Sequence, residues 1–155
     1  MTLHFINAQL IDPEAGTVTH GTIKVENGKI AAILDATASI PSDAQIVDCR
    51  GKYLAPGIVD LGVKVCEPGE RHKESFRSAG LAAAAGGVTT MVTRPDTNPT
   101  IDSPEVLEFV TRRANEAAPV NVVPMAALTK GREGRQRSGF SWMPVPWALP
   151  IVTVS

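Results

Sequence analysis

The stretch Gly57-Ile58-Val59-Asp60-Leu61 separates two parts of the chain that differ in pattern. It is short and mostly apolar, which is typical of a strand buried in a parallel sheet. After it, helix-forming segments at 74–85 and 103–118 alternate with β-rich segments at 88–93 and 120–125. Such alternation implies right-handed crossovers. It predicts an α/β fold in which a (β/α)₈ barrel is entered from a β module, with a doubly wound sheet as the alternative.

Residue types at the helix ends support these boundaries. Gly86-Gly87 suits a left-handed C-cap for the first helix. Asp102 or Ser103 can cap the second helix, with Pro104 in its first turn, and Pro119 cannot continue it. One apolar face of this second helix is predicted to carry Val106, Leu107 and Val110.

The residues before Gly57 have the signals of a small β module. Ile23–Glu26 alternates apolar and polar residues, and Lys29–Leu34 runs back after Asn27-Gly28. Asn-Gly favours a type I′ hairpin turn because both residues tolerate positive φ. Further short strands are predicted at Gln45–Asp48 and Lys52–Leu54, which makes residues 1–55 a β module, part of a composite β-sandwich.

Composition narrows the class of protein. Of 155 residues, 43% are hydrophobic, so a packed core is expected. Lys plus Arg (15) nearly balances Asp plus Glu (16), which gives no electrostatic reason to expect nucleic acid or a membrane as partner. The start lacks a signal-peptide pattern, and no apolar run reaches the roughly 18 residues of a membrane span. Cys49 and Cys66 belong to no metal or redox motif. We expect a soluble, cytoplasmic protein with two reduced thiols.

Several motifs in order along the chain resemble one enzyme family. The stretch Asp48–Asp60 is similar to the barrel entry of the amidohydrolase superfamily. Over roughly residues 20–135 the chain resembles dihydroorotase in particular, through Glu67-Pro68-Gly69 with Lys73-Glu74, Ala82–Thr90, Pro95–Asp102, Val122–Pro124 and Leu128–Gly131. The resemblance implies a barrel with metal and substrate at the carboxyl ends of its strands. It also implies reversible hydrolysis of dihydroorotate to carbamoyl aspartate, by a zinc-activated hydroxide, in pyrimidine synthesis.

The positions at which this family carries its chemistry are substituted. The resemblance places two histidine metal ligands at Gly62 and Lys64; glycine offers no ligand, and an ammonium group repels zinc. It places a substrate-binding arginine at Cys66 and an asparagine at Asp96. The first change removes a carboxylate clamp, and the second is expected to direct negative charge toward an anionic substrate. We predict no catalytic residue and no bound metal in this chain.

The replaced residues leave structural alternatives open. Lys64 either forms an ion pair with Asp60 or Asp96 in place of the metal, or is simply solvated. Asp60 orients the site in catalytic family members. Without a metal, a hydrogen-bonded structural aspartate is the expected role here.

The other candidate polar residues are given ordinary roles. His4, His20 and His72 fall outside any metal-ligand spacing and are expected on the surface or in loops. Arg71 and Lys73, in the loop after Glu67-Pro68-Gly69, are expected to be a solvated charge pair.

Three functions remain in view. The first is a non-catalytic dihydroorotase homologue that serves as a structural subunit; the resemblance implies aspartate transcarbamoylase as its partner, in an oligomer or complex. The second is an active zinc-dependent dihydroorotase or related cyclic amidase. The third is a non-functional truncated fragment, because a barrel closes only with all its strands and the predicted segment 56–135 supplies about three. The open strand edge would then invite aggregation or a partner.

The segment 136–155 departs from the family. Ser138–Ser155 has no charged residue yet contains Trp142 and Trp147. Tryptophan and methionine have single codons, so Trp142-Met143-Pro144 fixes bases that read Asp-Ala one frame over, as the family has there. We interpret the tail as a frameshift product, the alternative being a native tail that docks on something. The coding DNA tests this: read one frame over from about codon 136, it should stay open well past codon 155, and an early stop there would exclude it.

Overall fold

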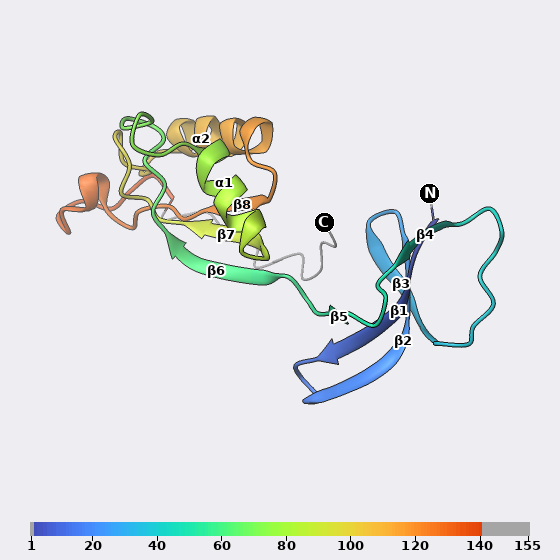
Figure 1. Cartoon of the computed structure of the whole chain (residues 1–155). Helices are drawn as coiled ribbons and strands as arrows, with labels where there is room; N and C mark the ends of the chain where they lie inside the picture. Colours follow the sequence, from blue (N-terminus) through green and yellow to red (C-terminus); the bar gives the residue numbers. More distant parts are fainter. Residues whose placement is uncertain (1, 141–155) are drawn as a thin grey trace. The chain divides into compact units, whose positions relative to one another are not determined.

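The computed structural model describes residues 2–140, and these divide into two compact units. The first unit ends at Gly57 and the second begins at Ile58 (Figure 1). Most of the predicted aberrant tail, residues 141–155, lies outside the described residues. No helix in the described part is long and apolar enough to cross a membrane.

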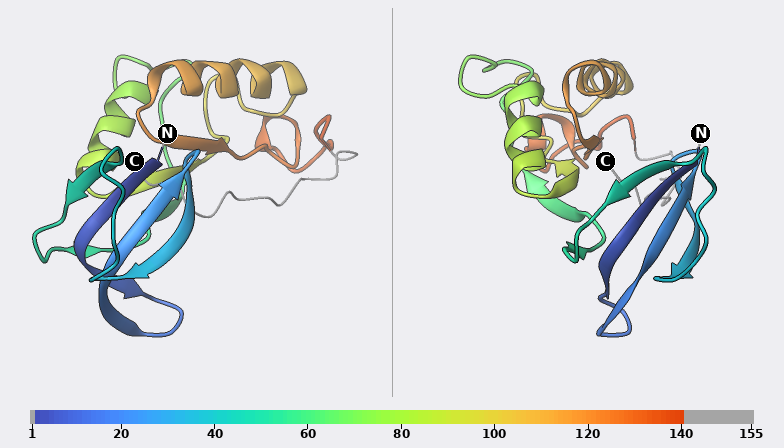
Figure 2. Two further views of the ribbon diagram at one scale, coloured as in Figure 1. Left: turned by 90° about the vertical axis from the view of Figure 1, so that its right-hand side faces the viewer. Right: turned by 45° about the vertical axis from the view of Figure 1, so that its right-hand side comes forward.

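The first unit is a five-stranded sheet in the order β3-β2-β1-β4, with β5 also paired to β1. The antiparallel strands β1–β3 form a meander, while β4 and β5 run parallel to β1. Figure 2 shows the twist of this sheet. The sequence did not reveal β1 as a separate strand. The strands are β1 (Thr2–Asp12), β2 (Thr17–Glu26), β3 (Lys29–Asp35), β4 (Gln45–Asp48) and β5 (Tyr53–Leu54).

The predicted hairpin is confirmed. Asn27 and Gly28 have φ values of 51° and 75°, and Glu26 pairs with Lys29 across the turn. Both turn residues therefore have the positive φ that a type I′ turn needs. His4 corrects an expectation: it lies in β1 and is only 2% exposed, rather than on the surface. Because β1 was not recognised as a strand, nothing in the sequence marked His4 as facing inward.

The second unit alternates strands and helices as predicted. Its three strands are parallel, in the order β6-β7-β8. The helices pack against β7 and β8 and against each other (Figures 1 and 2). The elements are β6 (Ile58–Val63), α1 (Phe76–Ala85), β7 (Val88–Thr93), α2 (Pro104–Ala117), β8 (Asn121–Pro124) and the 3₁₀ turn η1 (Lys130–Arg132).

The helix ends follow the residue signals. Ser75 caps α1 by accepting from the backbone N–H of Ser78, so α1 begins at Phe76 rather than at Glu74. After α1, Gly87 takes a φ of 80°, as a left-handed C-cap requires. Of the two candidate caps for α2, Ser103 fills the role by accepting from Val106 N.

The core of the second unit lies between the sheet and the two helices. Its buried members come from both helices, from β7 and from the connecting loops. The predicted face of α2 is confirmed, since Val110 is fully buried and Val106 and Leu107 pack against the core. The buried cluster consists of Val65, Phe76, Ala79, Met91, Ile101, Val110 and Ala114.

The expectation that Gly57–Leu61 forms a buried strand is wrong in one respect. The segment is a parallel strand, but Ile58, Val59 and Leu61 are 54%, 46% and 71% exposed. β6 is an edge strand that pairs only with β7 among the described residues. Burial of an apolar strand needs neighbours on its edge and faces, and the described residues supply these to β7 rather than to β6.

Candidate functional site at the carboxyl ends of the parallel strands

The carboxyl ends of β6 and β7 lie next to each other because the two strands are parallel and paired. Lys64 directly follows β6 and Arg94 directly follows β7. The backbone N–H of Arg94 donates to Val63 O at 2.9 Å, and that of Met125 donates to Thr93 O at 2.9 Å. Hydrogen bonds therefore continue past the strand ends and hold the segments that carry the first polar side chains. In barrel enzymes this end of the strands carries the active site.

Asp96 is the centre of an ion-pair cluster at this edge. Its Oδ2 lies 2.9 Å from the Arg94 guanidinium, 3.5 Å from Lys64 Nζ and 4.0 Å from the Arg132 guanidinium. The Asp96 side chain is only 10% exposed, whereas the three basic side chains are each about half exposed. Of the alternatives for Lys64, the structure shows the ion pair with Asp96. Two of the substituted family positions are thus in contact with each other.

The charge balance of this cluster corrects a further expectation. Asp96 was expected to present negative charge toward an anionic substrate. Instead, one carboxylate is surrounded by three cationic groups, two of which, Arg94 and Arg132, the sequence analysis did not single out. The local charge is therefore positive. Arg94 could have been suspected from its place directly after a predicted strand, but Arg132 is 36 residues from Asp96 and only the fold brings them together.

Gly62, the other position at which the resemblance places a metal ligand, lies in β6 with a φ of 86°. The pairing of β6 with β7 shifts register between Leu61 and Val63, so Gly62 sits at a bulge. Residues with a Cβ rarely adopt such a φ, and a histidine here would be strained although no atom lies within 4 Å of a Cβ built on it.

The residues present do not fit a zinc ion. Glycine supplies no ligand atom, and the Lys64 side chain is ion-paired with Asp96. Within residues 2–140, no group of three or more His, Cys, Asp or Glu residues is placed to hold a metal. Zinc sites in proteins need three or four such donors around one point.

Both cysteines are free thiols in the structure. Cys66, at the position matching the family arginine, is half-buried, and its carbonyl accepts from Glu70 N at 2.8 Å. Burial, followed by the nearby charge of Asp48, raises the pKa of the Cys49 thiol.

The remaining candidates divide between confirmed and corrected expectations. Asp60 is exposed on β6, and its carboxylate has no hydrogen bond within the described chain, so it is not the expected hydrogen-bonded structural aspartate. The edge position of β6 is the reason. His20 and His72 are exposed, as expected. Arg71 and Lys73 are also exposed, but each pairs with an acidic side chain, Arg71 with Glu67 and Lys73 with Glu70.

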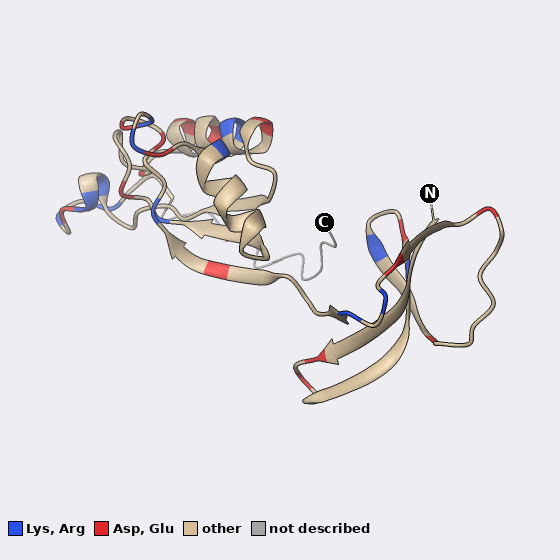
Figure 3. Cartoon of the chain, viewed as in Figure 1, with Lys and Arg blue, Asp and Glu red and all other residues tan. Residues whose placement is uncertain are grey.

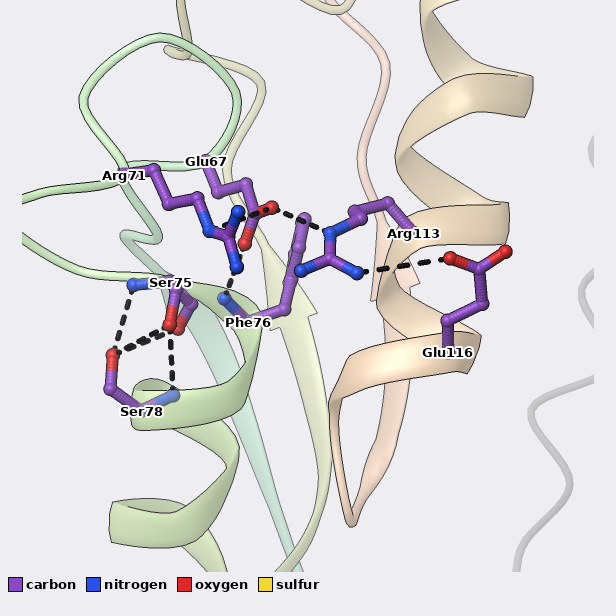
Figure 4. Close-up of polar contacts among 7 residues, drawn as sticks. All are labelled: Glu67, Arg71, Ser75, Phe76, Ser78, Arg113 and Glu116. Carbon is purple, nitrogen blue, oxygen red and sulfur yellow. Dashed lines mark hydrogen bonds and ion pairs between the residues drawn. The ribbon is translucent and has the colours of Figure 1, made fainter.

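A second polar network surrounds Glu67, whose side chain is 6% exposed (Figure 4). Its carboxylate accepts from Phe76 N at 3.0 Å, at the start of α1, and from Arg113 Nε at 2.8 Å, on α2. Arg71 adds an ion pair at 3.6 Å. Burial alone raises the pKa of this carboxyl, but the hydrogen bonds from Arg113 and Phe76 and the charges of Arg113 and Arg71 outweigh it, and the pKa is lowered.

Glu67 therefore has a structural role that the sequence did not reveal. It joins the loop after β6 to the first turn of α1 and to the middle of α2. The Glu67-Pro68-Gly69 motif was the available signal, but a motif shared with an enzyme family does not by itself separate a structural role from a catalytic one.

Comparison with known proteins agrees with the resemblance. The dihydro-orotase-like family model matches residues 51–145. A dihydroorotase of Syntrophus aciditrophicus is 40% identical over 132 residues, which are 85% of this chain and 31% of that protein. A dihydroorotase-like protein of Pseudomonas putida is 43% identical over 136 residues, 88% of this chain and 32% of that protein. The chain thus spans about a third of the length of these relatives.

Solved structures support the same fold. L-hydantoinase from Arthrobacter aurescens matches with a TM-score of 0.73 at 24% identity, over 82% of this chain and 28% of that one. A D-hydantoinase matches with a TM-score of 0.69 at 26% identity, over 83% and 28%. The predicted α/β fold, a β module followed by the first strands and helices of a barrel, is confirmed. On the match of the family model and the ordered motifs, this chain belongs to the dihydroorotase-like family.

Proposed function

We propose that this protein is a non-catalytic member of the dihydroorotase-like family and acts as a structural partner of aspartate transcarbamoylase in cytoplasmic pyrimidine synthesis. One observation carries the first part: Lys64, at a position where the resemblance places a metal-binding histidine, is ion-paired with Asp96. The positive charge of Lys64, paired with the Asp96 carboxylate, lies where the resemblance places a metal ion.

The chemistry of the four substituted positions supports this proposal. A zinc ion lowers the pKa of bound water to about 7, and without ligands for the zinc that nucleophile is not formed. Cys66 cannot form the two parallel hydrogen bonds by which an arginine holds a carboxylate. Gly62 sits at a bulge with a φ of 86°, so the loss of histidine there is accompanied by a backbone that suits glycine.

We expect neither this chain nor the longer product of a restored reading frame to bind zinc at this edge or to hydrolyse dihydroorotate measurably. Metal analysis of the purified protein and a hydrolysis assay with added zinc are the measurements. Restoring a single residue, as in Lys64→His, should rescue nothing, because three other positions remain substituted. Restoring all four family residues would also place a histidine at position 62, where the positive φ strains any residue that has a Cβ. Stoichiometric zinc together with turnover in the unmodified protein would contradict the proposal.

The partner is supported by the companion role that the resemblance implies for family members without the active site. The second unit keeps a packed core and its strand-end hydrogen bonds although the catalytic side chains are replaced. A fold that is kept while its catalytic side chains are replaced fits a structural role better than a catalytic one. Mixing the protein with aspartate transcarbamoylase from the same source should give a complex on size-exclusion chromatography. Independent elution at micromolar concentrations would exclude this partner while leaving the lack of activity untouched.

A further inference from the structure

The cluster around Asp96 contains more positive charge than its carboxylate can balance. Lys64, Arg94 and Arg132 all contact the same oxygen, Oδ2. One carboxylate balances one of the three cations, so two positive charges remain on groups that are about half exposed to solvent. Figure 3 shows basic residues on the η1 turn, which carries Arg132, and in the loop at the carboxyl end of β6.

Hydrogen bonds from backbone N–H groups hold the segments that carry Arg94 and Arg132. Arg94 is anchored by its N–H bond to Val63 O. The η1 turn is fixed by a 2.7 Å hydrogen bond from Gly131 N to the Asp102 carboxylate and by one from Arg132 N to Thr129 O at 3.1 Å. A ligand therefore meets cationic groups that are already gathered around Asp96, which lowers the entropic cost of binding.

Neighbouring acidic groups do not cancel this charge through any ion pair with the three cations. Glu70, in the loop after β6, is ion-paired with Lys73, and its charge acts on Lys64 only from beyond ion-pair distance. Asp102 accepts from the backbone of Gly131. Asp96 is therefore the one acidic residue within ion-pair distance of Lys64, Arg94 or Arg132 among residues 2–140.

We infer that Lys64, Arg94 and Arg132 form a metal-independent binding site for a small oxyanion, a carboxylate or a phosphate group. Two guanidinium groups can each offer paired N–H donors to two oxygens of one anion, and the ammonium group adds a third charge-assisted hydrogen bond. Asp96 holds the three cations together and balances one of their three charges. This inference rests on the proposed function, since it assigns the strand ends to anion binding in the absence of a metal ion.

The test is an NMR titration of this 155-residue chain in a chelator-containing buffer of low ionic strength. Inorganic phosphate and succinate are the two probes, and chloride at matched ionic strength is the control for general screening. We expect saturable shifts of the backbone amides of residues 64, 94 and 132. Lys64→Gln and Arg132→Gln should each weaken binding about fivefold or more. Lys29→Gln, which removes the same charge from the exposed start of β3 in the first unit, should leave binding unchanged.

Each outcome separates the possibilities. A response to phosphate but not succinate would assign the site to phosphate groups, and the reverse to carboxylates. Shifts that chloride reproduces, or losses equally large in Lys29→Gln, would overturn the inference, because they report net charge and not a site. Amide dispersion in each variant's spectrum shows whether that variant is folded. If Lys64→Gln does not fold, Arg132→Gln still tests the site, because Arg132 lies in an exposed turn. Zinc binding with turnover would refute the proposed function, whereas a flat titration would refute only this site.

Discussion

Glu67→Gln is expected to lower the free energy of unfolding by about 2–3 kcal/mol, the cost of leaving buried hydrogen-bonding groups without a charged partner. Glutamine keeps the size of the side chain and can still accept from Phe76 N, but it removes the charge that Arg113 and Arg71 face. The contact between the loop after β6 and α2 should weaken most. Urea unfolding near neutral pH, followed by circular dichroism, measures the change.

The same carboxylate predicts how this difference depends on pH. Its pKa in the folded protein is below the ordinary value of 4.5, so the folded state binds fewer protons than the unfolded state. The stabilisation is therefore complete above the unfolded pKa and is lost as pH falls through the folded pKa. Wild type and Glu67→Gln should differ by a constant amount near neutral pH and converge in acid below about pH 4.5.

Glu70→Gln is the matched control, since Glu70 lies in the same loop but its side chain is 46% exposed and pairs with Lys73. Exposed ion pairs contribute little to stability, so this variant should unfold close to wild type. Equal effects of the two substitutions, or a difference between wild type and Glu67→Gln that grows in acid, would show that Glu67 is not the buried junction described above.

Gly69→Ala is expected to cost about 2–4 kcal/mol, the sum of a strained backbone and an overpacked contact. Gly69 has a φ of 102°, and a Cβ built on it would lie 2.4 Å from Asn98 O and 2.7 Å from Asn98 Cβ. The contact is with the backbone of the loop after β7, which Asn98 N also ties to Pro68 O at 3.3 Å. One of the two loops must therefore move.

Gly134→Ala separates the two causes of this loss. Gly134 also has a positive φ, 75°, but no atom lies within 4 Å of its added Cβ. It should lose only the conformational part, about 1–2 kcal/mol. If thermal or urea unfolding gives the same loss for both variants, the close approach of Gly69 to Asn98 contributes nothing to stability.

Local sequence patterns were sufficient for much of the fold. Asn27-Gly28 predicted the hairpin because its turn needs two residues with positive φ, and Ser103 with Pro104 predicted the start of α2. The strand–helix alternation after Gly57 predicted the parallel sheet. Strand β1 was missed, and with it the burial of His4, because long-range pairing with β2, β4 and β5 defines that strand.

The candidate site shows the same division. Sequence alone predicts which family positions are substituted, since that comparison needs only the order of residues along the chain. It left open whether Lys64 is solvated or paired, and with which aspartate. It also misjudged Asp96, because the charge at a point depends on every group near it, including Arg132 from a turn far along the chain.

By itself, the sequence predicted the family, the alternation of strands and helices after Gly57 and the substitution of the metal-ligand positions, all of which follow from local propensity and motif order. Only the tertiary structure decided what replaced them. Parallel pairing of β6 and β7 brings Lys64 and Arg94 to one edge, the loop after β7 turns Asp96 between them, and η1 adds Arg132. Glu67 and Gly69 acquire their roles in the same way, from contacts with Arg113 and Asn98. Ion pairs and close contacts act over a few ångströms in space, and sequence separation does not report that distance.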